Sequence, residues 1–170
     1  MAGFADTTTD PVRQTRTSAI AYPGTGDFSR ADLVFTGVRH AGGSYEVRVF
    51  LNNPGATVDT GRDAGDGYAG RFHVFGHGGC FGDLGHCDVP GASDDPGDLR
   101  PPHQLTPLTT YLTVTGPLSR LLAGGTALAT VTMLAVSLPP RRADRAPGLD
   151  LFVFDHIDLR IYRTPGATPP

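Results

Sequence analysis

The alternation of hydrophobic and polar positions along the chain predicts strands and very little helix. The clearest run is 44–51, in which apolar and charged residues occupy opposite faces of one extended segment. Its apolar face holds Tyr45, Val47, Val49 and Leu51, and its charged face holds Glu46 and Arg48. The turn residues Asn52-Asn53-Pro54-Gly55 end the run. This segment is therefore predicted to be a strand with one buried face.

Other runs of β-type residues follow the same reasoning. The predicted strands are 33–38, 71–75, 108–115, 126–138 and 149–163. Ala41-Gly42-Gly43 is typical of a hairpin connection between the first two strands. One short helix is expected at Pro117–Ala123, because proline is favoured in a first helical turn and Gly124-Gly125 follows as a stop.

Many short strands joined by Gly- and Pro-rich turns indicate an all-β fold, an antiparallel β-sandwich with one short helix. Residues 28–164 are the predicted sandwich domain. Residues 1–27 lack periodicity and are predicted to be a flexible N-terminal arm. Residues 165–170 are predicted to be a Pro-rich tail.

Charge and composition narrow the function classes. The net charge is −3, all 14 basic residues are arginine, and the one basic cluster is Arg141-Arg142-x-x-Arg145. Nucleic-acid binding needs a basic face, so no nucleic-acid partner is expected. No apolar run is long enough for a membrane span, and residues 1–10 do not resemble a signal peptide. We expect a cytoplasmic protein, or one exported with a partner.

Candidate chemistry is concentrated in one glycine-rich loop, residues 76–90. It contains both cysteines of the protein, Cys80 and Cys87, together with His77 and His86, and His73 precedes it in a short β-type run. Glycine permits backbone conformations that other residues rarely adopt, so the loop is expected to take a specific shape. Thiol and imidazole groups are the preferred ligands of soft and borderline metals.

These side chains predict one metal-binding set. His77, Cys80, His86 and Cys87 offer two sulfurs and two nitrogens, with His73 or His103 in reserve. This donor set suits Cu(I) or Zn(II). Two alternatives stay open, because a Cys80–Cys87 disulfide could close the loop, or the cysteines could remain unpaired. No nucleophile motif and no carboxylate pair stands out, so no catalytic residue is predicted.

Several stretches, taken in chain order, resemble the C-terminal β-sandwich domain of type-3 copper proteins, the tyrosinases, polyphenol oxidases and molluscan haemocyanins. They are Thr36-Gly37-Val38, Tyr45–Asn52, Tyr68–Gly76, Leu112–Leu122 and Ala129–Val136. The similarity covers about residues 30–163. The chain departs from the family in lacking the helical domain whose six histidines hold two coppers.

The resemblance implies a role without catalysis. In that family the sandwich packs over the copper cleft and inserts a side chain into its mouth, and in some members a cysteine pair helps load copper. By position, Phe81 or Leu84 would be the inserted side chain and Cys80 and Cys87 the pair, although the family's pair is commonly closer in sequence. The expected partner is a tyrosinase-like helical copper domain, in trans or from the same parent protein.

Three functions therefore remain under consideration. The first is an accessory domain or subunit of a type-3 copper oxidase, which shields the copper cleft and assists copper loading by Cu(I) transit. The second is a stand-alone copper-binding protein that uses the loop 73–87. The third is an interaction or storage module whose loop is held by a disulfide. Oxidase activity of this chain alone is not expected.

Overall fold

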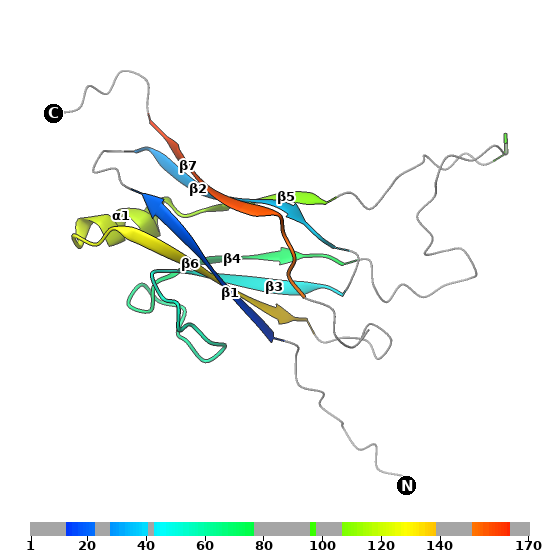
Figure 1. The fold of residues 1–170 in the computed structure, drawn as a ribbon, viewed down its shortest axis with the longest axis horizontal. Coiled ribbons are helices and arrows are strands. Elements are labelled where there is room, and N and C mark those ends of the chain that lie inside the picture. Colours follow the sequence, from blue (N-terminus) through cyan, green and yellow to red (C-terminus); the bar gives the residue numbers. More distant parts are fainter. Residues whose placement is uncertain are drawn as a thin grey trace, which may run out of the picture.

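The computed structural model describes residues 13–22, 28–40, 43–76, 96–97, 107–138 and 151–163. They form two antiparallel sheets and one short helix (Figure 1). The four-stranded sheet has the order β1-β6-β3-β4, and the three-stranded sheet has the order β5-β2-β7. The strands are β1 (Arg13–Tyr22), β2 (Arg30–Val38), β3 (Tyr45–Leu51), β4 (Tyr68–Val74), β5 (Leu108–Thr113), β6 (Leu128–Ser137) and β7 (His156–Tyr162), and the helix is α1 (Thr115–Ala123).

The core lies between the two sheets. Val47 and Val49 of β3 and Val131 and Met133 of β6 are completely buried, as the alternation in the sequence predicts. The facing residues of β2, Leu33 and Phe35, are equally buried and belong to the same apolar cluster. Burial on both inner faces confirms the predicted all-β sandwich.

Aromatic rings extend the core toward one end of the sandwich. The ring of Phe35 lies 5.0 Å from that of Phe72, and Phe152 packs against Phe154 with ring centroids 4.8 Å apart. The hydroxyl of Tyr45 reaches the carbonyl of Arg39 at 3.1 Å, and burial raises its pKa above the usual range. The ring of Tyr45, at the start of β3, also lies 5.9 Å from that of Phe152, in the segment that precedes β7.

One sequence-based prediction is wrong for residues 13–22, which were expected to belong to a flexible arm. They form β1, an edge strand whose partner is β6, with Arg16 opposite Met133 and Ser18 opposite Val131. Thr, Ser, Arg and Ala dominate β1, so its composition does not resemble that of a buried strand. The strand forms because it pairs with the long, buried β6.

The predicted hairpin at Ala41-Gly42-Gly43 is also wrong, because β2 and β3 belong to different sheets. The run 149–163 proves shorter as a strand, since β7 begins only at His156. Before it, the backbone N–H of Phe152 donates to Oε1 of Gln14 at 2.7 Å, and its ring is buried in the core. The segment before β7 is therefore not a strand, although it places the ring of Phe152 in the core.

The helix agrees with its sequence signals. It begins at Thr115, so Pro117 stands in its first turn, and it ends before Gly124. Gly125 has a φ of +73°, a conformation that glycine adopts without strain.

Strands β4 and β5 are edge strands of their two sheets and lie on the same side of the sandwich. They approach closely there, because a Cβ on Gly70 of β4 would lie 3.1 Å from Cδ1 of Leu112 of β5.

Candidate functional site

The predicted metal, disulfide and cleft-inserting residues lie outside the described part of the chain, with one exception. Positions 77–95 and 98–106 contain His77, Cys80, Phe81, Leu84, His86, Cys87 and His103. Their roles therefore stay predictions. The exception is His73, which lies on β4, three residues before the end of the described segment.

The described residues at the end of β4 form the base from which the loop departs. Val74 is buried, and the backbone N–H of Gly76 donates to Oγ of Ser44 at 3.1 Å. Between them Phe75 is 76% exposed. The loop therefore starts from an anchored backbone that presents a bare aromatic ring to solvent.

Large exposed hydrophobic side chains are few in the described part of the chain: Phe75, Leu108, Tyr111 and Tyr162. Phe75 directly follows β4 and Leu108 begins β5. Figure 1 shows these two strand ends at the same end of the sandwich. Tyr111, which is 52% exposed, lies on β5 as well. Three of the four residues thus belong to the end of β4 and to β5, the two elements that flank the segment 77–106.

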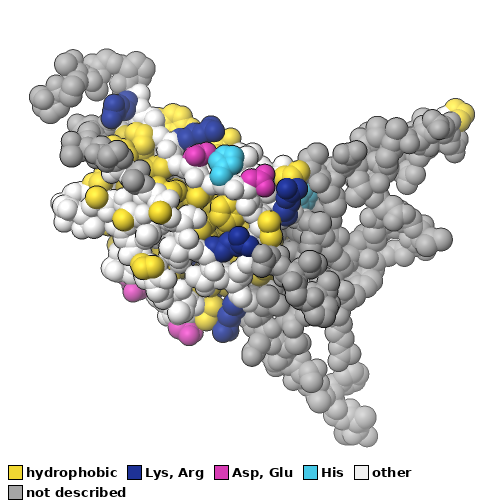
Figure 2. All heavy atoms as spheres, viewed as in Figure 1, with side chains coloured by type: hydrophobic (Ala, Val, Ile, Leu, Met, Phe, Trp, Pro, Cys, Tyr) yellow, Lys and Arg dark blue, Asp and Glu magenta, His cyan; other side chains and the backbone are white. Residues whose placement is uncertain are grey.

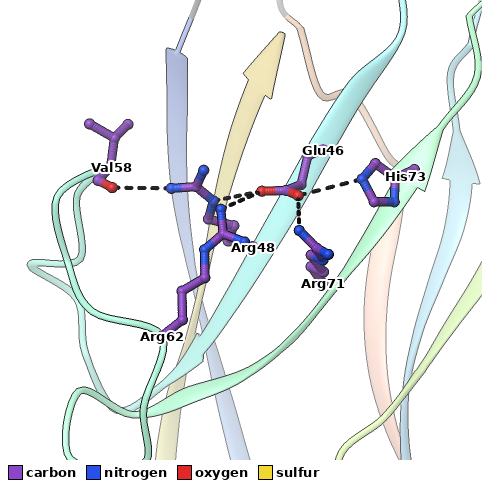
Figure 3. Close-up of polar contacts among 6 residues, drawn as sticks. All are labelled: Glu46, Arg48, Val58, Arg62, Arg71 and His73. Carbon is purple, nitrogen blue, oxygen red and sulfur yellow. Dashed lines mark hydrogen bonds and ion pairs between the residues drawn. The ribbon is translucent and has the colours of Figure 1, made fainter. Parts of the chain in front are cut away.

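His73 takes part in a polar cluster on the outer face of the four-stranded sheet (Figure 3). Its Nε2 lies 3.4 Å from Oε2 of Glu46, the residue directly opposite on β3. Arg71 and Arg48 are likewise opposite each other in this register. Residues two apart on a strand share a face, so both pairs lie on the same outer surface.

Glu46 is the centre of this Glu46 cluster. Its Oε1 accepts from Arg48 Nε at 2.7 Å and from Arg62 at 3.2 Å, and its Oε2 accepts from Arg71 at 2.8 Å. Burial by itself raises the pKa of Glu46, but the hydrogen bonds from Arg48 and Arg71 and the nearby charges outweigh it. The pKa of Glu46 is therefore below its usual value.

The cluster fastens the loop 52–67 across the outer face of the sheet. Arg62 comes from this loop, and Arg48 Nη1 also donates to the carbonyl of Val58 at 3.1 Å. Beside these contacts, Phe50 and Leu134 of the sheet pack with Ala56 of the loop in a second apolar cluster. Because Arg71 and His73 belong to β4, the same cluster holds the strand that carries the loop base.

Chemically, the Glu46 cluster is an ion-pair network. A carboxylate held by three guanidinium groups stays ionised at neutral pH and is poorly suited to proton transfer. Sequence reasoning placed Glu46 and Arg48 on one face but did not identify the network. The signal available was the pairing of Glu46-x-Arg48 with Arg71-x-His73 on two runs that are separated by a turn-rich segment.

A shallow cleft of about 240 Å³ lies at the opposite end of β4. It is bounded by Leu51, Tyr68, Pro117, Arg120 and Leu121, among others, between the loop 52–67 and α1. Within the described residues, no group of three or more His, Cys, Asp or Glu side chains is arranged to hold a metal ion. No helix among those residues is long and apolar enough to cross a membrane.

Comparison with known proteins gave matches among solved structures. No protein-family model matches the chain, and no curated protein sequence matches it. One structural neighbour is a recombinantly expressed latent aurone synthase (polyphenol oxidase), with a TM-score of 0.49 and 16% identity over 95% of this chain. Two others are the same enzyme co-crystallized with hexatungstotellurate(VI). One was also soaked in H2O2 and gives a TM-score of 0.48 and 16% identity over 96% of this chain. The other gives 0.48 and 14% over 93%.

All three are polyphenol oxidase chains. This chain spans only about a quarter of their length, because the matches cover 27%, 28% and 26% of the neighbours.

Proposed function

We propose that this chain is a non-catalytic accessory domain or subunit of a tyrosinase-like type-3 copper oxidase. The observation that carries the proposal is the agreement between sequence resemblance and structural elements. The five stretches that resemble the accessory sandwich fall, in chain order, on β2, β3, β4, the β5–α1 passage and β6. A resemblance confined to one strand would be uninformative, whereas five stretches in order follow most of the chain.

The described surface supports such a role. An accessory domain that shields a cleft needs a contact surface next to the side chain it inserts. Phe75, Leu108 and Tyr111 are exposed on the elements that flank 77–106, the segment that contains the candidate inserted residues Phe81 and Leu84. Exposed aromatic residues are enriched in protein interfaces. The hydrogen bond at Gly76 and the Glu46 cluster would keep the end of β4, and with it Phe75, in one position while a partner binds.

The proposal is tested by capture with the full chain as bait in an extract of the cells that make it. The expected result is enrichment of a copper oxidase whose helices carry paired histidines, and oxidation of catechol by the captured fraction. Phe75→Asp should weaken capture, because it places a charge in the contact surface. Tyr162→Ser changes an exposed aromatic residue of β7, away from the loop base, and should leave capture unchanged.

Two results would contradict the proposal. One is that the wild-type bait captures no more histidine-rich copper oxidase than the Phe75→Asp bait does. The other is catechol oxidation by the purified, copper-loaded chain alone, because an accessory domain derives its activity from its partner.

A further inference from the structure

We propose that two copies of this chain pair, strand to strand, into a dimer through β5, which has β2 as its one strand partner among the described residues. Such a dimer would join two three-stranded sheets into one continuous sheet of six. The inference does not require the proposed function, but it uses Leu108 and Tyr111, which the proposed function also assigns to a contact surface.

The four edge strands of the sandwich differ in how well they are protected. An exposed edge presents unpaired backbone groups, and proteins usually block such edges with charges, prolines or bulges. The other three edges carry charged residues: Arg13 and Arg16 on β1, Arg71 on β4, and Asp158 and Arg160 on β7. In Figure 2 basic, acidic and histidine side chains are interspersed over the region of β7.

Strand β5 itself carries neither a charge nor a proline, and the irregularity in its pairing with β2 lies between Thr36 and Val38 of β2. Its sequence, Leu-Thr-Thr-Tyr-Leu-Thr, contains no charge, no proline and no glycine. One side of the strand pairs with β2 from Thr113 to Leu108. Among the described residues, no strand other than β2 pairs with it. Leu108 and Tyr111 are 38% and 52% exposed on this edge, where the composition favours strand pairing.

The sequence of β5 matches itself when read in the antiparallel direction. In a twofold arrangement centred on Thr110, Leu108 of one copy lies opposite Leu112 of the other, and Thr109 lies opposite Tyr111. Aliphatic pairs and pairs of an aromatic with a β-branched residue are favourable across strands. Because β5 carries no charge, this pairing sets no like charges against each other. This self-complementarity favours a second copy as the occupant over an unrelated strand.

The interface would be small. A single strand pair of six residues buries less surface than a standard stable interface, so we expect a weak, concentration-dependent dimer. The pairing is isologous, with the same patch used by both copies, and therefore closes at two chains without forming fibres.

Charge complementation gives a sharp test with the full chain. Thr109 and Tyr111 are both exposed on the outer face of the sheet, so charges there do not enter the core. The double variant Thr109→Glu/Tyr111→Glu places Glu opposite Glu twice in a self-dimer, and Thr109→Lys/Tyr111→Lys places Lys opposite Lys twice. Sedimentation velocity between micromolar and millimolar concentration should show wild-type dimerisation and at least about tenfold weaker self-association of each variant.

An equimolar mixture of the two double variants should restore the dimer as a heterodimer, since every Glu then faces a Lys. Thr15→Lys, an exposed change on the β1 edge, serves as a control and should dimerise like the wild type. A wild-type chain that stays monomeric over the whole range overturns the inference. So do charged variants that dimerise as well as the wild type, because the contact would then lie elsewhere. If the wild-type chain is monomeric and the charged double variants no longer capture the copper oxidase, the edge of β5 binds another protein and the dimer is refuted.

Discussion

Replacing Glu46 by Gln tests whether the Glu46 cluster stabilises the fold. Glutamine keeps the size of the side chain and removes its charge, which leaves three guanidinium groups without their shared carboxylate. The Glu46 side chain is only 10% exposed, and its two shortest contacts are to Arg48 and Arg71 at 2.7 and 2.8 Å. We expect Glu46→Gln to lower the free energy of unfolding by about 2 kcal/mol.

The magnitude follows from how deeply each partner is buried. A hydrogen bond to a charged group contributes about 1.5–3 kcal/mol when it is protected from water. Of the three arginines, only Arg48 is well protected, with 16% of its side chain exposed. Arg62 and Arg71 are 41% and 48% exposed, so water can replace the carboxylate, and each contributes about 0–1 kcal/mol. Together the three contributions amount to about 1.5–5 kcal/mol. Glutamine can still accept one hydrogen bond, so the expected loss of stability lies in the lower half of this range.

The assay is equilibrium unfolding in urea at neutral and acidic pH. The pKa of Glu46 is lower in the folded chain than its ordinary value of 4.5. Its carboxylate therefore contributes fully above that ordinary value, and the contribution is lost as pH falls through the lower, folded-state pKa. The difference between the wild type and Glu46→Gln should be largest at neutral pH and should shrink in acid.

Asp158→Asn is the matched control. This carboxylate lies on β7, is 51% exposed, and has the Nε2 of His156 at 3.3 Å as its partner. Its replacement should change the free energy of unfolding by less than about 0.5 kcal/mol. The reasoning fails if Glu46→Gln unfolds at the same urea concentration as the wild type. It also fails if the difference persists unchanged at acidic pH, because the charge would then not be its cause.

Two further predictions concern the core and the cysteines. Val49→Asp should prevent folding, because it buries an unpaired charge in the core, whereas Thr15→Asp should melt like the wild type by circular dichroism. If the loop handles copper, the reduced chain should bind about one Cu(I), and Cys80→Ser or Cys87→Ser should remove most of that affinity in a competition assay, with His77→Ala or His86→Ala weakening it less. If a disulfide closes the loop, reduction should instead lower stability by about 1–3 kcal/mol, and a chain that is fully reduced as isolated and does not bind Cu(I) contradicts both alternatives.

The fold could be predicted wherever burial on one face leaves a period in the sequence. Val47 and Val49 on β3, and Val131 and Met133 on β6, alternate because one side of each strand faces the core. The helix was predictable from Pro117 and the glycines that follow it. Such signals are local, and a single stretch of sequence is enough to contain them.

Features that depend on a partner strand could not be predicted in this way. The sequence of β1 is polar and rich in threonine, and it becomes a strand through its pairing with β6. The connection after β2 resembles a hairpin because glycines mark any reversal, whether the chain returns to the same sheet or crosses to the other. Local turn chemistry does not distinguish these two outcomes, so the assignment of β2 and β3 to separate sheets required the structure.

The Glu46 cluster likewise has one contact that is visible in a single strand and others that depend on the fold. The attraction between Glu46 and Arg48 is visible in one strand, but Arg71 and His73 become neighbours only through the β3–β4 register, and Arg62 only through the fold of the loop 52–67. The register in turn follows from burial, because a shift of β4 by one residue would turn Phe72 and Val74 out of the core. The apolar residues of β4 thus determine where its polar residues lie. The same packing that buries Phe72 places Arg71 and His73 beside Glu46 and anchors the strand end from which Phe75 is exposed.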